Sequence, residues 1–149
     1  ASTAVYKGEQ EDASGKVIRK MVEEAGLDVV FMKALPTDKT VLSTVFQRMA
    51  DGNLADLILT TGGAGCGPED CTPEATMEVV DRPLLGIPEG MRAHMLTLTK
   101  RAMLNRAAAG IRGKVVIVNL PGKAGAVKEC LGYILPEVMH AVEVAQGIK

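Results

Sequence analysis

The sequence has few aromatic residues and no tryptophan, since Phe and Tyr together make up only 3% of its 149 residues. Proteins that bind single-stranded nucleic acid commonly stack bases on aromatic side chains. The formal net charge is −1, so there is no overall positive field to attract nucleic acid or an anionic membrane. No apolar run approaches the roughly 18 residues needed to span a bilayer. We therefore expect neither nucleic acid nor a membrane as a partner.

Cysteine is also scarce, and its count is odd: Cys66, Cys71 and Cys130. A disulfide framework pairs its cysteines, and a structural zinc site gathers four Cys or His ligands at characteristic spacings. Cys66 and Cys71 are five residues apart, and no second Cys or His pair accompanies them. The cysteines indicate a protein of a reducing compartment, and we expect a cytoplasmic location.

What the sequence does have is enough apolar material for one core. Hydrophobic residues make up 47% of the chain and charged residues 23%, which is typical of a folded globular domain. A length of 149 residues fits one domain. We therefore treat residues 1–149 as a single domain whose core is built from aliphatic side chains and methionine.

Charge is balanced overall but separated along the chain. The segment from Asp51 to Met91 has eight acidic residues and one base, Arg82, whereas the segment from Lys100 to Lys128 has seven bases and no acid. The two segments could be solvated faces that neutralise each other. Alternatively, they could meet in a cleft that holds both a cation and an anionic ligand.

Hydrophobic periodicity predicts strands alternating with helices. Three short runs rich in β-branched and aliphatic residues are expected to be strands: Leu27–Met32, Leu57–Thr61 and Lys114–Asn119. Caps and prolines predict helix starts at Ser14, at Thr37 or Asp38, at Thr72, at Pro88 and at Pro136, with shorter helices around Met103–Ala109 and Val127–Leu131. This order is typical of an α/β domain with a mostly parallel sheet.

Two glycine-bearing loops, Gly62–Pro68 and Asn119–Gly122, each follow a predicted buried strand. Ligands of parallel α/β sheets bind at the carboxyl ends of the strands, so both loops are expected at one edge. Gly62-Gly63-Ala64-Gly65 could present backbone N–H groups to a phosphate, or it could simply be a tight turn. It is neither a Walker loop nor a dinucleotide fingerprint, because the lysine and the third glycine spacing are missing.

Two acidic residues lie close to loop or helix starts. Asp70 precedes the predicted Thr72 cap, where it could hold Mg²⁺ between protein and nucleotide oxygens, or serve as a second cap or a solvated acid. Asp12, followed by Ser14 and Gly15, could cap a helix or contact a ligand.

Several of these segments together resemble the molybdopterin adenylyltransferase family. They are Leu57–Gly65, Asp70–Thr76, Gly110–Gly113, Asn119–Gly122 and Glu129-Cys130. They occur in the family's order and with compatible spacing over nearly the whole chain. The family includes bacterial MogA and MoaB-type proteins and the G domains of gephyrin and of plant Cnx proteins.

The resemblance implies a three-layer α/β/α sandwich, known as the molybdopterin-binding fold, with a mostly parallel central sheet and assembly into a homotrimer. It implies a reaction in molybdenum cofactor biosynthesis, in which the terminal phosphate of molybdopterin attacks the α-phosphorus of Mg-ATP. The products would be adenylyl-molybdopterin, for transfer to a molybdenum-insertion enzyme, and pyrophosphate. Mg²⁺ would be the cofactor, and ATP and molybdopterin the substrates. Because the nucleophile is already an anion, positioning and charge neutralisation should dominate the catalysis.

The resemblance also assigns roles to residues. Asp70 matches the family's catalytic aspartate, and Asp38 lies next to Thr37, where the family has another; both are expected to act in catalysis and to bind the metal ion. The residues expected to bind substrate are Asp12, Ser14, Gly15, Gly62, Gly63, Gly65, Thr72, Asn105, Asn119, Pro121 and Gly122.

The sequence departs from the family pattern at Thr37, Ala64, Glu69 and Asn105. Residue 1 aligns after the family's first strand, so we expect that strand to be missing from residues 1–149. Two alternatives stay open: a non-catalytic molybdopterin-binding or carrier module, and a related domain that acts on another nucleotide or pterin.

Overall fold

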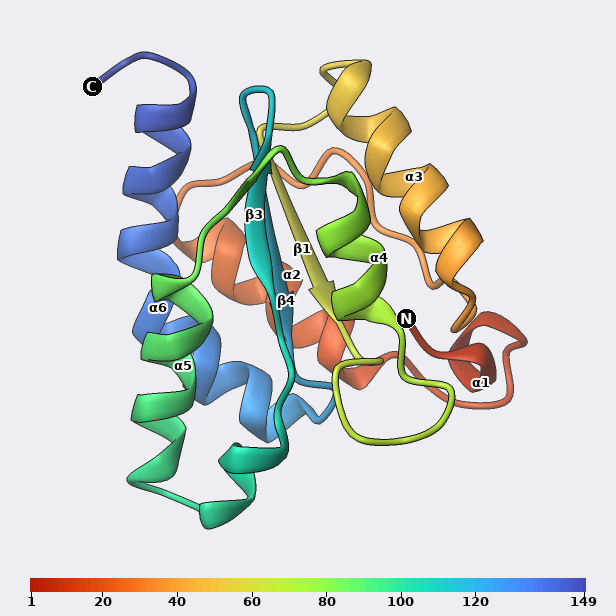
Figure 1. Cartoon of the computed structure of the whole chain (residues 1–149). Coiled ribbons are helices and arrows are strands. Elements are labelled where there is room, and N and C mark those ends of the chain that lie inside the picture. The colour runs from red at the N-terminus through yellow and green to blue at the C-terminus, as the bar shows by residue number, and fades with distance from the viewer.

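The computed structural model describes all residues from 1 to 149 and shows one layered α/β domain (Figure 1). Its elements, in chain order, are α1 (Thr3–Tyr6), α2 (Ala13–Glu24), α3 (Lys39–Asp51), β1 (Leu57–Thr61), α4 (Thr72–Val79), β2 (Arg82–Pro83), α5 (Gly86–Leu96), the 3-10 helix η1 (Lys100–Leu104), β3 (Ala109–Arg112), β4 (Val115–Leu120) and α6 (Ala124–Ala145). None of the helices combines the length and apolarity required to cross a bilayer.

The sheet has four strands in the order β1-β4-β3-β2. β1 runs parallel to β4, whereas β3 is antiparallel to β4 and β2 is antiparallel to β3. The α/β class is confirmed, but the expectation of a mostly parallel sheet is wrong in this detail. The reason is the tight turn at Gly113, whose φ of +59° favours glycine, because a short hairpin can only join antiparallel strands.

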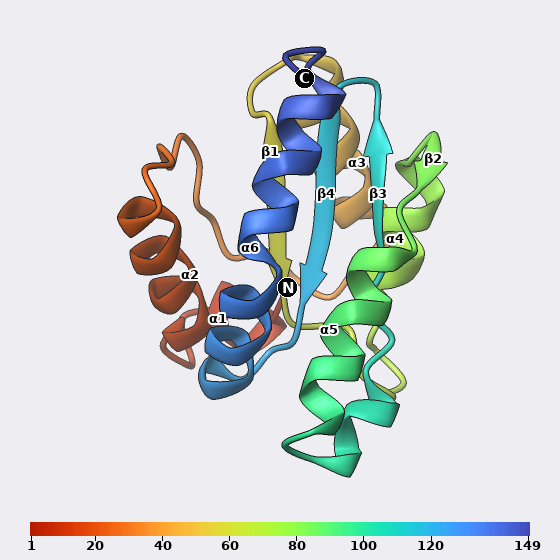
Figure 2. The same ribbon diagram turned by 90° about the vertical axis from the view of Figure 1, so that its left-hand side faces the viewer.

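Helices cover both faces of the sheet and complete three layers (Figure 2). α2, α5 and α6 pack together on one face, and α3 and α4 pack together on the other. Every residue of β4 is buried, as expected for a central strand with both faces covered. Each face has its own apolar cluster, one around Val118 and Leu131 and the other around Leu42 and Phe46.

The predicted strand Leu27–Met32 does not form. The segment is irregular, and the side chains of Val30, Phe31 and Met32 are 68%, 50% and 42% exposed. A strand needs a hydrogen-bonding neighbour, and the sheet ends at β1 without pairing to this segment. β-Branched composition alone therefore did not decide its conformation.

Several predicted helix boundaries also need correction. Asp12 caps α2 in place of Ser14, because its carboxylate accepts a hydrogen bond from the Gly15 N–H at 2.9 Å. Asp38, one of the two predicted caps, starts α3. Thr72 begins α4, but its hydroxyl makes no cap bond.

Two further differences concern the C-terminal half. The predicted helix around Met103–Ala109 does not form, because the 3-10 helix η1 ends at Leu104, residues 105–108 are irregular and Ala109 begins β3. α5 begins at Gly86, before Pro88. Pro136 lies inside the single 22-residue helix α6 and does not open a new one. Proline lacks the N–H that a helix interior uses, but Leu131 and Val138 on either side are fully buried, and this packing holds the helix together.

Candidate functional site

The two glycine-bearing loops meet at the carboxyl ends of β1 and β4, as predicted. Thr61 pairs in register with Leu120, and the two strands end side by side (Figure 2). The Thr61 hydroxyl donates to the Pro121 carbonyl at 2.6 Å, and the Gly62 N–H donates to the Leu120 carbonyl at 3.3 Å. The parallel pairing of β1 with β4 thus builds one loop cluster from segments 60 residues apart.

Glycine is required at the start of the first loop. Gly62 and Gly63 have φ values of +85° and +70°, which side chains other than glycine adopt only with strain. A Cβ on Gly63 would also lie 2.3 Å from the Thr72 hydroxyl oxygen. That hydroxyl donates to the Gly62 carbonyl at 2.9 Å, and Thr72 is fully buried. In this geometry Thr72 fixes the loop and faces no ligand.

The carboxylate of Asp70 lies inside the same loop. Its Oδ2 accepts the Gly67 N–H at 2.9 Å, and a Cβ on either Gly65 or Gly67 would come within 3.0 Å of that oxygen. The Asp70 carboxylate therefore lies against the glycine loop. The Gly67 N–H is bonded to Asp70, whereas the N–H groups of Gly63, Ala64, Gly65 and Cys66 make no hydrogen bond within the chain.

Arg106 holds this loop from outside, and the sequence analysis did not identify it. Its Nε donates to the Gly65 carbonyl at 2.6 Å, one terminal nitrogen donates to the Asp70 carbonyl at 2.9 Å, and the other contacts both carboxylate oxygens of Glu74 at 2.9 Å. The Arg106 backbone N–H also bonds to the Ala64 carbonyl. One guanidinium thus joins both ends of the loop to the first turn of α4.

The charge separation along the chain could have pointed to this contact. Arg106 of the basic segment pairs with Glu74 of the acidic segment, and Arg112 pairs with Asp51 in the same way. The fold places the two segments against each other, so neutralisation between faces accounts for these two pairs. The partners in these two pairs are 32 and 61 residues apart, so the sequence did not indicate which residues pair with each other.

Asp12 and Asp38 cap the two helices that flank this edge. Their carboxylates accept backbone N–H groups from Gly15 at 2.9 Å and Val41 at 3.1 Å. An added Cβ on Gly15 would lie 2.2 Å from an Asp12 oxygen, so glycine is needed there for the cap. Asp12 and Gly15 also line a cavity of about 1070 Å³ beside β1, as do Ser14, Gly62 and Gly122.

Two titratable groups report on the electrostatics of this region. Burial raises the pKa of the Cys71 thiol, and the negative charges of Glu74, Asp38 and Asp70 raise it further. Burial lowers the pKa of the Ala1 amino group, and the charge of Asp12 partly opposes this. The carboxylates of Glu74, Asp38 and Asp70 are therefore close enough to Cys71 to act on its thiol, and the ammonium of Lys39 opposes them.

Asp70 and Asp38 are the two carboxylates predicted to bind Mg²⁺, and each accepts a backbone N–H of its own segment in this structure. No group of three or more His, Cys, Asp or Glu side chains is gathered that could hold a metal ion by itself. Mg²⁺ is commonly bound through one or two carboxylates plus substrate phosphates, and it retains water ligands. Asp70 and Asp38 supply carboxylate oxygens of this type.

The side-chain amides of two predicted ligand-binding residues bond within the chain, and only that of Asn119 is buried. Asn119 is fully buried; its amide nitrogen donates to the hydroxyls of Thr60 at 3.0 Å and Thr76 at 2.9 Å, and its amide oxygen accepts the Ala108 N–H at 3.1 Å. The Asn105 carboxamide oxygen accepts the Ala107 N–H at 2.7 Å. Asn119 thus joins β1, β4 and α4 and has no free polar atom to offer a pterin in this geometry.

Comparisons with known proteins agree with this architecture. Residues 1–140 match the family model described as "Probable molybdopterin binding domain". A curated relative named molybdopterin adenylyltransferase, from Helicobacter pylori, is 36% identical over 149 residues, covering 99% of this chain and 85% of that protein. The protein of that name from Haemophilus influenzae is 34% identical and covers 88% of this chain and 66% of its own length.

Solved structures show the same fold. The molybdopterin biosynthesis enzyme MoaB from Thermus thermophilus superposes with a TM-score of 0.92 at 37% identity, covering 98% of this chain and 92% of that one. The tungsten cofactor synthesizing protein MoaB from Pyrococcus furiosus gives a TM-score of 0.83 at 37% identity, with coverages of 97% and 92%.

The fold and the loop cluster define a layered α/β domain of the molybdopterin-binding class. The chain belongs to the family of molybdopterin-binding domains of molybdenum cofactor biosynthesis.

Proposed function

We propose that this protein is a molybdopterin adenylyltransferase of molybdenum cofactor biosynthesis. It transfers AMP from Mg-ATP to molybdopterin and releases pyrophosphate. The names of the relatives from Helicobacter pylori and Haemophilus influenzae support this reaction. The site supports it because a glycine loop that can bind phosphates adjoins carboxylates that can bind Mg²⁺.

The observation that carries the proposal is the position of the Asp70 carboxylate inside the glycine loop, bonded to the Gly67 N–H. A magnesium-bound triphosphate brings its own cation, which is a stronger partner for the carboxylate than one N–H. Asp70 would then turn to the metal ion and leave the loop N–H groups to the phosphates. Catalysis of this kind consists of positioning and charge neutralisation.

The direct test is pyrophosphate release in the presence of ATP, Mg²⁺ and molybdopterin, with each component omitted in turn. We expect release only when all three are present. Asp70→Asn should lower kcat by about 100-fold or more, because an amide cannot replace a metal-binding carboxylate. Molybdopterin binding, measured by calorimetry, should be retained in this variant; an unchanged kcat would refute the role of Asp70.

The same hydrogen bond favours one alternative, a non-catalytic molybdopterin-binding or carrier module. If Asp70 stayed bonded to Gly67 in the presence of Mg-ATP, its carboxylate would not be available to the metal ion. Calorimetry separates the two functions, since the carrier binds molybdopterin but not ATP.

We also propose that three copies of the chain assemble and that the adenylylated product passes to a molybdenum-insertion enzyme. The assembly is supported by exposed apolar side chains at the end of α5 and on η1, where Leu98, Met103 and Leu104 are 57%, 70% and 56% exposed. Such a surface is typical of a protein interface.

The three free cysteines support a cytoplasmic location.

A further inference from the structure

Arg106 holds the glycine loop, and the chain on both sides of Arg106 is itself held by a second arginine. Arg92 of α5 donates from Nη1 to the carbonyl of Asn105 at 3.4 Å and to the carbonyl of Ala107 at 3.0 Å. These two residues directly precede and follow Arg106. Neither carbonyl accepts another hydrogen bond from the chain. Arg92 therefore fixes the main chain from which the Arg106 side chain extends.

The chain from Asn105 to Ala107 depends on such contacts because it lies between the end of η1 and the start of β3, outside any helix or strand. Regular secondary structure therefore does not fix its backbone. The Asn105 side-chain oxygen accepts the Ala107 N–H at 2.7 Å, and the Arg106 N–H donates to the Ala64 carbonyl at 2.8 Å. Together with the contacts of Arg92, these bonds set the direction in which the Arg106 side chain points.

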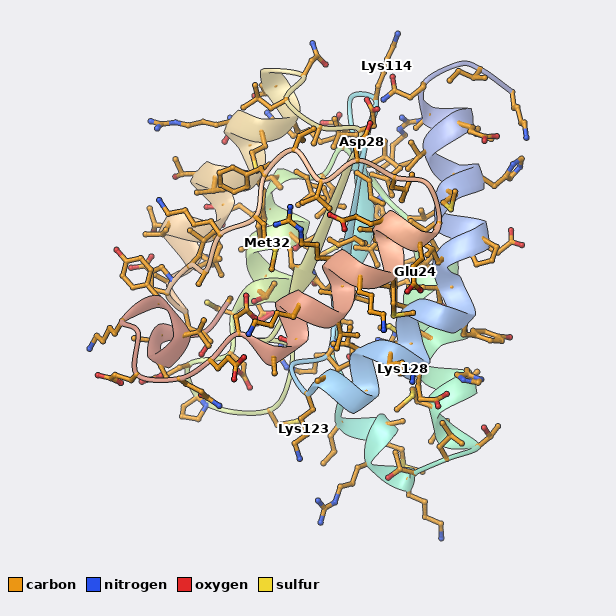
Figure 3. The ribbon with its side chains drawn as sticks, turned by 180° about the vertical axis from the view of Figure 1, so that it is seen from behind. Glu24, Asp28, Met32, Lys114, Lys123 and Lys128 are labelled. Carbon is orange, nitrogen blue, oxygen red and sulfur yellow. The ribbon has the colours of Figure 1, made fainter.

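Helix α5 gives Arg92 a fixed base. Its neighbour Met91 is fully buried and belongs to the same apolar cluster as Leu131 of α6. Figure 3 shows the start of α6, marked by Lys123 and Lys128, at the end of the domain where the chain passes from α5 into η1. Because α5 packs against α6, the guanidinium of Arg92 extends from the packed layer of helices and not from a loop.

The other end of this connection is the loop that carries Asp70. Arg106 donates to the carbonyls of Gly65 and Asp70, and the Asp70 carboxylate accepts the Gly67 N–H. A continuous set of hydrogen bonds thus runs from α5, through Arg92 and the carbonyls beside Arg106, to both ends of the loop. The position of a catalytic group matters greatly, since a displacement of about 1 Å can lower a rate by about 100-fold.

We propose that Arg92 is a positioning residue for Asp70, and that it acts through the main chain on both sides of Arg106. Arg92 makes its own hydrogen bonds to that main chain and none to the loop. Without its Nη1, the two carbonyls lose their donor, the Arg106 guanidinium shifts, and the loop no longer holds Asp70 in one place. The kinetic effect rests on the adenylyltransferase function proposed above, whereas the link between the two arginines does not.

The kinetic test is a double-mutant cycle of Arg92→Met and Arg106→Met, read as pyrophosphate release. Methionine keeps much of the apolar stem of arginine and removes every N–H donor. Arg92→Met should lower kcat by about tenfold and change the KM for molybdopterin by less than about twofold. In the Arg106→Met background, the same substitution should change kcat by less than about twofold, because its route to Asp70 is already broken.

The matched control is Arg48→Met, because Arg48 lies exposed on α3, and its kinetics should equal those of the unmodified protein. A tenfold fall in kcat on substitution of Arg92 in both backgrounds would overturn the proposal, since Arg92 would then act independently of Arg106. In an active protein, an unchanged kcat for Arg92→Met would overturn it as well.

The second readout does not depend on activity. The Nε–H of Arg106 donates to the Gly65 carbonyl, and its exchange with solvent can be followed by NMR. In Arg92→Met, this exchange should become about tenfold faster or more. The Nε–H of Arg112, which donates to Asp51, should be unaffected and is the internal control.

Unchanged exchange at the Arg106 Nε–H would refute the link between the two arginines. Faster exchange in a protein without adenylyltransferase activity would support the link and refute only the proposed function. If Arg92→Met does not fold, Arg92→Gln replaces it in both measurements, since the glutamine amide nitrogen is two bonds closer to the backbone than Nη1 and falls short of the two carbonyls. The same outcomes then decide.

Discussion

Arg106 is the residue that organises the loop at the candidate site. Its guanidinium connects the carbonyls of Gly65 and Asp70 with the carboxylate of Glu74. A planar, forked donor can satisfy three acceptors at fixed angles, which the point charge of lysine cannot. Arg106 is therefore a positioning residue for Asp70.

We expect Arg106→Lys to lower kcat for pyrophosphate release by about tenfold, because the loop loses its fixed geometry while the charge remains. The KM for molybdopterin should change less than kcat. Stability should fall by at most about 1 kcal/mol, since the ion pair with Glu74 is partly exposed. Steady-state kinetics and urea unfolding check these expectations.

Arg101→Lys is the matched control, because Arg101 lies exposed on η1 outside the loop. Its kinetics should equal those of the unmodified protein. Equal kinetics for both variants would show that Arg106 does not position Asp70.

At the residue level, the sequence identified the candidate groups whose roles depend on neighbours along the chain. The glycine loop and Asp70 lie within ten residues of each other and are in contact. Arg106 and the inward-facing Asn119 could not be assigned in this way, because most of their side-chain partners are 32 to 59 residues distant along the chain. The ligand contacts themselves stay predictions.

At the scale of elements, β1, β4 and α4 are joined through the buried amide of Asn119. Its three hydrogen bonds reach Thr60, Thr76 and the Ala108 N–H. Buried polar groups without partners are destabilising, and each one typically costs about 1–3 kcal/mol. The loop cluster at the end of these strands rests on this connection.

Asn119→Ala should destabilise the protein by about 3 kcal/mol, because two hydroxyls and one N–H lose their partner. The midpoint of urea unfolding measures the change. Asn105→Ala, which removes one half-buried hydrogen bond, should cost about 1 kcal/mol. A smaller effect for Asn119→Ala than for Asn105→Ala would refute the bridging role.

Helix α6 contains the buried thiol of Cys130, and burial raises its pKa to about 11. The raised pKa means that the folded state favours the uncharged thiol. This contribution to stability is complete below the unfolded pKa, near 9, and is lost as the pH rises towards 11.

We expect the free energy of unfolding to fall by about 2 kcal/mol more in the unmodified protein than in Cys130→Ala between pH 8 and pH 11. Urea unfolding at several pH values checks the difference. At pH 8, a thiol reagent should modify the exposed Cys66 well before Cys130. Parallel stability curves for the two proteins would contradict the assignment.

At the scale of the whole molecule, apolar side chains are left exposed at the junction of α5 and η1. Leu98, Met103 and Leu104 lie at this end of the domain, and the Leu104 carbonyl accepts a hydrogen bond from the Cys66 thiol of the glycine loop. Burial against another copy would remove this apolar area from water, and a closed symmetric assembly would bury it in every subunit.

Met103→Glu should dissociate the proposed trimer, because a charge at a buried contact between subunits is costly. Light scattering coupled to size exclusion should show three times the chain mass for the unmodified protein and one chain mass for the variant. Thr40→Glu on the exposed face of α3 is the control and should keep the trimer. An unmodified protein that elutes as a monomer would refute the assembly.

The sequence by itself determined the α/β class, the helices with local caps, the buried strands β1 and β4 and the glycine loops after them. These features depend on interactions within a few residues, such as the Asp12 and Asp38 caps and the positive φ values of Gly62 and Gly63. Tertiary structure alone decided whether the segment after α2 found a strand partner, that the sheet is mixed, and that Arg106 reaches Asp70. The physical reason is that strand pairing and hydrogen bonds between distant side chains depend on which surfaces the fold brings together, and local composition carries no record of that choice.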